Sequence, residues 1–321
     1  MSLHAVKMLG INITNSSRET ILKEIQKGLE VGGKWGDNFP KTGRKTLVIV
    51  TPNPEQVVYA RGHSHFREVL NRADVAIPDG VGLVWASKIL SRLPITDYRL
   101  SIVKAIPGVD LMDDLVRIAE IRHVPVALIG GSGDLALKAF ECLRQKHPGL
   151  TGLAMGAPEF VVGSSGLAFA QNDMSGELKG REFQVNDSDL NFPLVYENLE
   201  IYIQQLTRKL KDAGVQMVFV GLGAPKQEYL IEKLRSSFIV HGKANQKTMN
   251  HEQRTNNLVI FMSVGGSFDV IAGRIRRAPV VFRSIGFEWL WRLIIEPWRI
   301  RRQLALLKFA FLVLKERYRF K

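Results

Sequence analysis

The sequence of 321 residues predicts an α/β protein with a Rossmann-like, mostly parallel sheet, flanking helices and a basic amphipathic helical appendage at its C-terminus. Three features lead to this prediction. Short apolar segments end in Gly or Pro, stretches of helical period lie between them, and the last fifty residues mix basic with large apolar side chains. Buried apolar strands that alternate with helices are typical of a doubly wound parallel sheet.

Five segments are expected to form the central strands. Each is short and apolar and runs directly into a loop rich in Gly or Pro: residues 46–50, 75–77, 124–129, 217–220 and 259–264. Amphipathic stretches such as 111–121, 135–145 and 202–213 have the apolar spacing of helices. Ligands of open parallel sheets bind beyond the carboxyl ends of the strands. We therefore expect the five loops to converge on one pocket.

Three polar stretches have no clear periodicity: residues 34–44, 162–194 and 241–257. We expect them to be surface loops or locally disordered segments. Residues 1–271 are expected to form the α/β domain, and residues 272–321 the appendage.

The appendage is expected to lie on an anionic membrane. Residues 272–321 hold 13 Lys/Arg and 3 Asp/Glu, so they carry +10 of the formal net charge of +13. Trp289, Trp291, Trp298, Phe309 and Phe311 alternate with this charge, as in segments that bind anionic lipid. Nucleic acid is a less favoured partner than the membrane. The alternative to a membrane-binding appendage is a C-terminal helix that packs on the same domain, with its Trp residues in the core. An exposed appendage without lipid would promote homo-oligomers.

Other features of the sequence point to a cytoplasmic protein on the inner face of the membrane. Cys142 is the only cysteine and has no partner for an internal disulfide. No basic segment followed by a long apolar run begins the chain. No window reaches the ~18 uncharged apolar residues of a spanning helix; the best candidate, 304–314, contains Lys308.

Asp79 is the candidate general base. It follows an expected strand and precedes Gly80 and Gly82, so its carboxylate is expected to project into the pocket. A carboxylate in such a place can take a proton from a hydroxyl group. An equally good interpretation is that Asp79 caps the helix expected at residues 81–90.

Polar residues in the other loops are candidate binding groups. Thr51 and Asn53 have side chains that can bind a sugar or phosphate, although capping of the helix at 54–61 is somewhat favoured. Lys226 and Gln227 open a helix directly after a strand, and the following Glu228 is placed to complement the helix dipole.

A glycine-rich loop resembles a phosphate cradle. Gly130, Gly131 and Gly133 follow an expected strand, and their backbone N–H groups can approach an anion at a helix N-terminus. The loop has neither the complete dinucleotide-binding spacing nor a Walker lysine. No His/Cys cluster or D-x-D pair with metal-ligand spacing occurs, so no metal site is expected.

With these loops in view, the sequence resembles the WecG/TagA/CpsF family of bacterial glycosyltransferases from about residue 11 to residue 302. The resemblance rests on ordered motifs: TPN (51–53), IPDGVG (77–82), IPGVDLM (106–112), LIGGSG (128–133), GLGAPKQE (221–228), VGGSFDVIAGRIRRAP (264–279), and GFEWLWRL with EPWRIRR (286–302).

The resemblance implies an inverting, metal-independent transferase without a cofactor. Members move N-acetylmannosamine or its uronic acid from a UDP-sugar to an undecaprenyl-diphosphate-linked acceptor. Asp79 matches the family's proposed base, and Thr51, Asn53 and Gln227 match its polar pocket residues. The family's appendage docks on the membrane and brings arginines to the active site. By motif and spacing these are Arg292, Arg299 and Arg302.

One position departs from the family pattern. Many members have an Arg two residues before the Pro/Ala-Gly-x-Asp motif, where this sequence has Ala105, with Lys104 beside it. Two alternatives therefore stay open. One is an exopolysaccharide transferase that uses another UDP-hexose or UDP-uronic acid. The other is a basic protein without catalysis that binds a membrane or nucleic acid.

Overall fold

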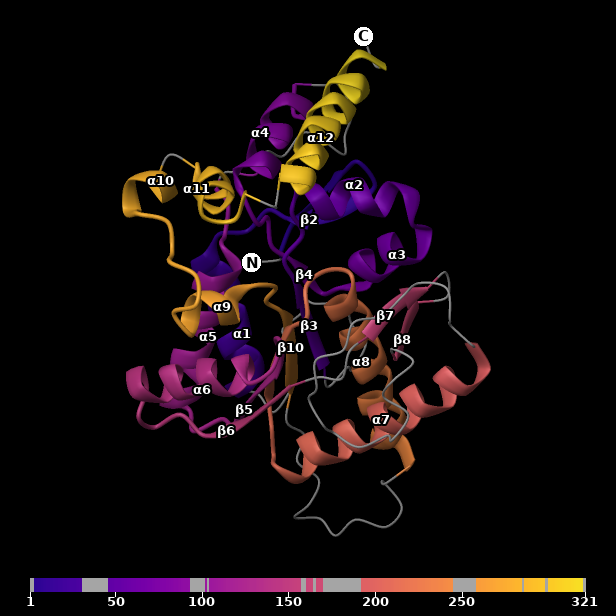
Figure 1. The fold of residues 1–321 in the computed structure, drawn as a ribbon, viewed down its shortest axis with the longest axis vertical. Coiled ribbons are helices and arrows are strands. Elements are labelled where there is room, and N and C mark those ends of the chain that lie inside the picture. The colour runs from indigo at the N-terminus through magenta and orange to yellow at the C-terminus, as the bar shows by residue number, and fades with distance from the viewer. Residues whose placement is uncertain are drawn as a thin grey trace.

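The computed structural model describes residues 3–30, 46–92, 102, 104–156, 160–163, 166–169, 192–244, 258–284, 286–297 and 300–319. Within these ranges the predicted α/β architecture is confirmed (Figure 1). A parallel sheet lies at the centre, helices cover both of its faces, and the C-terminal helix projects from the body (Figure 1).

The central sheet has six strands in the order β4-β3-β10-β9-β5-β6, and all neighbours are parallel. The strands are β4 (Val75–Ala76), β3 (Thr46–Val50), β10 (Val259–Ser263), β9 (Met217–Gly221), β5 (Val126–Gly130) and β6 (Gly152–Met155). Every residue of β3, β5, β9 and β10 is buried, as expected for strands that are covered on both faces. The edge strand β6 was not among the five predicted strands. Its sequence Gly-Leu-Ala-Met has no β-branched residue, so its composition does not indicate a strand.

Helices form a layer on each face of the sheet. One layer holds α2 (Pro54–Gly62), α3 (Ser64–Arg72), α4 (Val81–Leu90), α7 (Phe192–Asp212) and α8 (Lys226–Ala244). The other holds α1 (Arg18–Glu30), α5 (Gly108–Ile121), α6 (Leu135–Lys146) and α9 (Ser267–Ile271). Strand β3 serves both layers, since Val48 and Val50 pack into the first core and Leu47 and Ile49 into the second. This alternation is the two-residue period of a strand.

Two antiparallel hairpins flank the sheet. The first joins β1 (Ala5–Met8) to β2 (Ile11–Thr14), and the hydroxyl of Thr14 accepts a hydrogen bond of 3.0 Å from the backbone N–H of Ala76 in β4. The second joins β7 (Phe160–Gly163) to β8 (Gly166–Phe169) and contacts α7 and α8.

Two of the three polar stretches therefore contain regular structure. Strand β8 and the start of α7 fall within residues 162–194, and α8 continues to Ala244 within residues 241–257. The prediction of irregular loops was wrong for these parts. The remainder of both stretches, and residues 34–44, lie outside the described residues.

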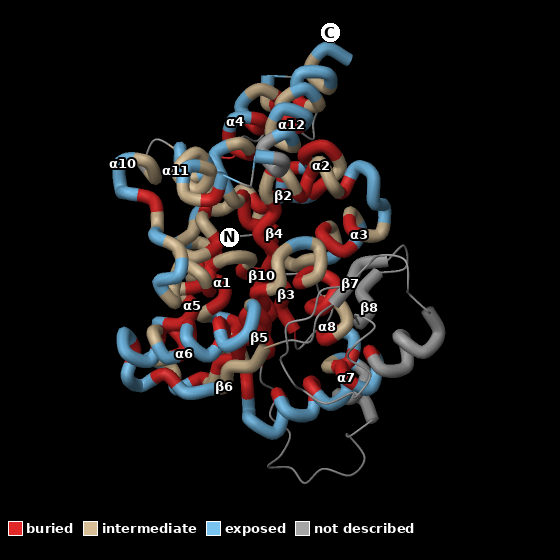
Figure 2. The backbone as a smooth tube through the Cα atoms, viewed as in Figure 1, coloured by how far each residue is buried: buried red, intermediate tan, exposed pale blue. Residues whose placement is uncertain are grey.

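The C-terminal segment contains α10 (Val280–Ser284), α11 (Glu288–Ile295) and α12 (Ile300–Arg319). Helix α12 packs on α2 and α4, and it buries Phe309 and Val313 there. The outer side of α12 is exposed along much of its length (Figure 2). None of the helices in the described ranges combines the length and apolar character that a bilayer-spanning helix needs.

Candidate active site

The loops at the carboxyl ends of the strands meet at one edge of the sheet. The Thr51 hydroxyl, after β3, donates a long hydrogen bond of 3.5 Å to the carbonyl oxygen of Ser263 at the end of β10. Between the loops after β5 and β9, the N–H of Gly131 donates to the carbonyl oxygen of Gly221 at 2.9 Å. The polar residues that the sequence places in these loops are thus brought to a common edge.

Asp79 lies in the loop after β4, at the carboxyl ends of the strands, and hydrogen bonds to the loops after β3 and before α5 fix its backbone. Its N–H donates to the carbonyl oxygen of Pro52 at 3.0 Å, and the N–H of Ile106 donates to the carbonyl oxygen of Pro78 at 2.9 Å. The next residue, Gly80, has a φ of 93°, a conformation that favours glycine, and is the N-cap of α4. These contacts fix the path of the backbone on which the carboxylate stands.

The Asp79 carboxylate caps α5 and not α4. It accepts a hydrogen bond from the backbone N–H of Gly108, the first residue of α5. The N-cap residue of α5 is Pro107, which has no side-chain acceptor, so the loop after β4 supplies the cap. The alternative interpretation, that Asp79 caps the helix at residues 81–90, was therefore wrong, because Gly80 is the N-cap of α4.

The surroundings of Asp79 raise its pKa to about 7, and desolvation by burial is the largest cause. The negative charges of Glu288 and Asp110 raise the pKa further, whereas the Gly108 N–H and the Arg292 guanidinium lower it. A carboxyl group with a pKa close to neutral pH is suited to accept a proton from a hydroxyl group.

Arg292 of α11 reaches the end of β10. Its Nη2 lies 2.9 Å from the position that a Cβ atom on Gly266 would take. Its Nε lies 3.7 Å from Oε2 of Glu296, yet Nε and Nη2 are buried without a hydrogen-bond acceptor in the described part of the chain. Buried guanidinium N–H groups in this position are available for an anion. The other two arginines indicated by the family motifs are not described: Arg299 and the side chain of Arg302 lie outside the described residues.

A turn between α10 and α11 brings the C-terminal segment to Asp79. Gly286 has a φ of 79°, and a Cβ on it would lie 2.9 Å from the Cβ of Val81, two residues after Asp79. Trp291 is partly buried, contacts the ring of Phe282 at a tilt of 55° with ring centroids 5.4 Å apart, and donates from Nε1 to the carbonyl oxygen of Arg276. Trp289 is exposed and Trp291 is only partly buried, so neither of these two Trp residues is a core residue.

Thr51 and Asn53 are held by the protein itself. Thr51 is buried, and its methyl group lies 3.2 Å from the position that a Cβ on Gly108 would take. The side chain of Asn53 accepts a hydrogen bond of 3.0 Å from the N–H of Gln56, so Asn53 caps α2. This capping was the favoured interpretation of Asn53, and it leaves the amide NH₂ group for a ligand.

Gln227 and Glu228 are almost completely buried at the start of α8. Oε1 of Gln227 accepts a hydrogen bond of 2.9 Å from the N–H of Gly265, and its Nε2 donates to Oε1 of Glu228 at 2.8 Å. Burial raises the pKa of Glu228 to about 7. Lys226 is half-buried beside them, at the first position of α8.

The glycine-rich loop after β5 packs against β9. Gly130 has a φ of 112°, and a Cβ on it would lie 2.8 Å from the carbonyl oxygen of Gly221. The hydroxyl of Ser132 accepts a hydrogen bond of 3.0 Å from Arg274. Because the Gly131 N–H is bound to Gly221, Gly130 and Gly131 here serve close packing, while Gly133, with a φ of 58°, borders open space.

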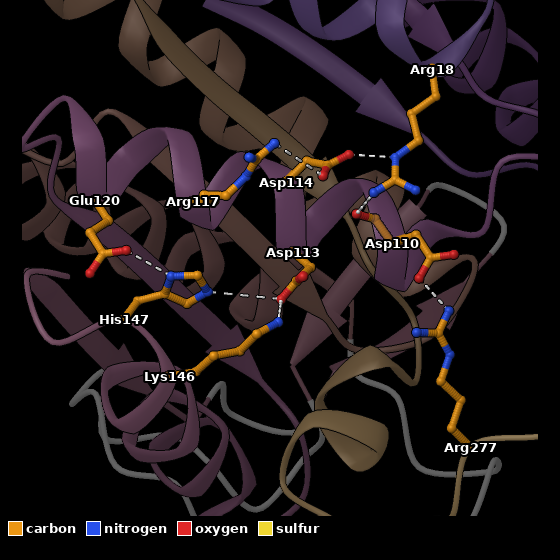
Figure 3. A network of polar contacts seen from close by, with 9 residues as sticks. All are labelled: Arg18, Asp110, Asp113, Asp114, Arg117, Glu120, Lys146, His147 and Arg277. Carbon is orange, nitrogen blue, oxygen red and sulfur yellow. Dashed lines mark hydrogen bonds and ion pairs between the residues drawn. The ribbon is translucent and has the colours of Figure 1, made fainter.

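A network of ion pairs supports α5, the helix that Asp79 caps (Figure 3). Arg277, from the start of the C-terminal segment, pairs with Asp110 in the first turn of α5. Arg18 of α1 pairs with Asp114 and donates to the carbonyl oxygen of Asp110 at 3.0 Å. The Asp110 charge raises the pKa of Asp79, and Arg277 partly neutralises that charge. Arg277 therefore affects the Asp79 carboxylate through Asp110.

Sequence reasoning missed four contributors to the site: Gly108, Arg277, Gly266 and the buried position of Glu228. Arg277 had a local signal, since it stands in a run of three arginines between residues 274 and 277. The departure at position 105 places a half-buried Ala105 and an exposed Lys104 just before α5. In the described part of the chain, His, Cys, Asp and Glu do not gather in threes around a point that suits a metal ion.

The sequence matches a known family over almost its whole length. The family model "Glycosyl transferase WecG/TagA/CpsF family" matches residues 6–321. The chain belongs to the WecG/TagA/CpsF family of glycosyl transferases. The family resemblance and the prediction of an enzyme are thereby confirmed.

Curated relatives cover nearly the whole chain. A protein of Staphylococcus aureus (strain NCTC 8325 / PS 47) is 26% identical over 98% of this chain and 94% of its own length. Its counterpart in strain MRSA252 is 27% identical over the same shares. Both are named N-acetylglucosaminyldiphosphoundecaprenol N-acetyl-beta-D-mannosaminyltransferase.

Proposed function

We propose that this glycosyltransferase moves N-acetylmannosamine from its UDP-sugar to N-acetylglucosamine linked to undecaprenyl diphosphate, with inversion and without a metal ion. The observation that supports the proposal is the relationship to enzymes named N-acetylglucosaminyldiphosphoundecaprenol N-acetyl-beta-D-mannosaminyltransferase, over 98% of this chain and 94% of theirs. The product would enter cell-surface polysaccharide or teichoic acid synthesis.

Asp79 is proposed as the general base. Its carboxylate takes the proton of the acceptor hydroxyl, and the hydroxyl oxygen then attacks the anomeric carbon opposite the leaving group. The bond between that carbon and the UDP oxygen breaks, and UDP leaves with the electron pair, so the configuration is inverted. The pKa of about 7 supports this role, because the ionised form is available at neutral pH and still basic enough to accept a proton.

Arg292 is proposed to neutralise the charge that develops on UDP. Its buried Nε and Nη2 groups lack a hydrogen-bond acceptor in the described chain, and Nη2 lies beside Gly266 in the loop after β10. Preorganised donors of this kind stabilise a departing anion strongly. Arg299 and Arg302 are proposed to act with it, and Thr51, Asn53, Gly80, Lys226, Gln227 and the glycine-rich loop to bind the donor.

The C-terminal segment is proposed as a membrane-docking appendage, residues 272–321, on a catalytic domain of residues 1–271. Large apolar side chains stand exposed on it: Val280, Val281, Ile294, Ile300, Leu304, Leu307, Phe311, Leu314 and Tyr318. Combined with a charge of +10, this surface suits the anionic inner face of the plasma membrane, where a polyprenyl-linked acceptor is found.

A second candidate is the same reaction with another UDP-hexose or a UDP-uronic acid. The observation that favours it is Ala105 at a position where many family members carry an arginine, because loss of a guanidinium changes which donor or acceptor groups can be bound there.

A donor panel separates these candidates. The enzyme would be incubated with polyprenyl-diphosphate N-acetylglucosamine and one UDP-sugar at a time, and the lipid product would be identified by mass spectrometry. We expect the mass of one added N-acetylmannosamine with UDP-N-acetylmannosamine. Transfer of a hexose or uronic acid, and not of this sugar, would contradict the proposal in favour of the second candidate.

A further inference from the structure

The proposed reaction leaves one buried acid without a role. Glu228 is only 1% exposed, although carboxylates are rarely buried unless they are paired. No Lys, Arg or His side chain in the described ranges forms an ion pair with it. Stabilisation of the helix dipole, the role that the sequence indicates, needs a charge near the first turn but not this degree of burial.

The contacts of Glu228 fix the orientation of the neighbouring amide. The backbone N–H of Gly265 can only donate, so the atom of Gln227 that it meets at 2.9 Å must be the oxygen Oε1. The nitrogen Nε2 then faces Glu228 and donates to its Oε1 at 2.8 Å. A flipped amide would set a donor against a donor at Gly265 and an acceptor against an acceptor at Glu228.

The ends of the two neighbouring strands are also polar and buried. Ser263, the last residue of β10, is fully buried, and neither its hydroxyl nor Oε2 of Glu228 has a hydrogen-bond partner in the described part of the chain. The carbonyl oxygen of Ser263 accepts from Thr51 after β3 at 3.5 Å. Hydrogen bonds thus join Glu228 to Gln227 and Gln227 to Gly265, while Thr51 and Ser263 form a separate contact.

We propose that Glu228 is a positioning residue that locks the Gln227 amide and so presents the second N–H of Nε2 to the sugar-nucleotide donor. This N–H has no acceptor in the described part of the chain. The donor assignment rests on the function proposed above, whereas the locking of the amide does not. Glu228 acts only through Gln227 and touches no substrate itself.

The test compares Glu228→Met with Glu228→Gln. Methionine keeps the length of the side chain but cannot accept the hydrogen bond, whereas glutamine retains Oε1 as an acceptor. We expect Glu228→Met to weaken binding of the UDP-sugar and raise its KM by about tenfold, the effect of one lost hydrogen bond. We expect a smaller change in kcat and, for Glu228→Gln, donor affinity within about threefold of the wild type.

A second background separates positioning from general stability. In Gln227→Ala, the further change Glu228→Met is expected to alter donor affinity by less than about twofold, because the residue it positions is gone. Glu232→Met is the matched control, since Glu232 lies on the same helix and pairs with Arg72 on the surface. We expect this control to retain wild-type donor affinity.

A measurement without substrate tests the locking directly. In protein with ¹⁵N-labelled glutamine, the side-chain NH₂ of Gln227 is expected to exchange slowly in the wild type and in Glu228→Gln, and rapidly in folded Glu228→Met. An unchanged exchange rate in Glu228→Met would overturn the proposal. An equal loss of donor affinity in the presence and absence of Gln227 would overturn it as well. Absence of transfer by the wild type with every donor would instead count against the proposed function.

Discussion

Nη2 of Arg292 lies 2.9 Å from the point where a Cβ on Gly266 would stand. The C-terminal segment therefore reaches the end of β10 through a contact that only glycine permits. Because the obstructing atom is the tip of a flexible side chain, a methyl group at residue 266 would displace the guanidinium and leave the fold intact.

Gly266→Ala is therefore expected to lower transfer activity without lowering the melting temperature. Its φ of −83° is open to alanine, so the effect comes from the displaced Arg292. We expect kcat/KM to fall about tenfold or more, since a donor aimed at the leaving group is moved. Gly62→Ala is the control, because a Cβ there meets nothing within 4 Å. Additive losses in Gly266→Ala combined with Arg292→Ala would contradict the assignment.

Asp79→Asn is expected to lower kcat/KM by about 100- to 10,000-fold and to remove its rise with pH. The wild type should gain activity as pH rises through about 7, because the ionised carboxylate is the base. UDP binding, measured by calorimetry, should change little. Full activity of this variant would remove Asp79 as the base.

Asp79→Asn is expected to lower activity but to become relatively stabilising as the pH rises. The native pKa of Asp79 is about 7 and its ordinary value is 3.8, so the native state holds the proton at pH values where the unfolded state has lost it. The stability of the wild type relative to Asp79→Asn is thus full below about pH 4 and declines as pH rises through 7. Thermal unfolding at pH 5 and pH 8 should show that asparagine becomes relatively more stabilising at the higher pH.

Arg277→Gln is expected to shift the pH dependence of activity upwards. Asp110 raises the pKa of Asp79, and Arg277 partly neutralises Asp110. Loss of the arginine leaves the Asp110 charge less compensated, although Arg18 remains nearby, so a higher pH is needed to ionise Asp79. Asp110→Asn should shift the profile downwards. Arg274→Gln, whose arginine is exposed and binds Ser132, is the matched control and should leave the profile unchanged.

The outer side of α12 is expected to bind anionic lipid. Leu307 and Phe311 are 70% and 64% exposed, so changing both to serine should not alter thermal stability but should reduce sedimentation with phosphatidylglycerol vesicles. Phe309→Ala is the comparison, because Phe309 is 2% exposed and its loss should destabilise the packing of α12 on α2 and α4. Undiminished vesicle binding by the serine variant would place the lipid contact elsewhere.

The sequence predicts the centre of the sheet well and its surroundings less well. Strands such as 46–50 and 259–263 are apolar except for one terminal Thr or Ser because they are buried on both faces, and this pattern can be recognised without a structure. Strand β6 has little local signal, since its pairing with β5 and not its composition makes it a strand.

In the candidate site too, some residues could be predicted from the sequence and some contacts could not. Asp79 and Arg292 stand in recognisable motifs, but the capping of α5 by Asp79 depends on a contact between two loops that are 29 residues apart. Glu228 has the position of a dipole-complementing residue, and only the packing around Ser263 and Gln227 makes it a buried one.

The most direct test of the central claim is release of UDP from UDP-N-acetylmannosamine in the presence of EDTA, with and without polyprenyl-diphosphate N-acetylglucosamine. We expect release that depends on the lipid-linked acceptor and persists in EDTA. Release that is abolished by EDTA and restored by a divalent ion would contradict transfer without a metal. Absence of UDP release both with and without the lipid-linked acceptor would contradict the proposed donor and acceptor.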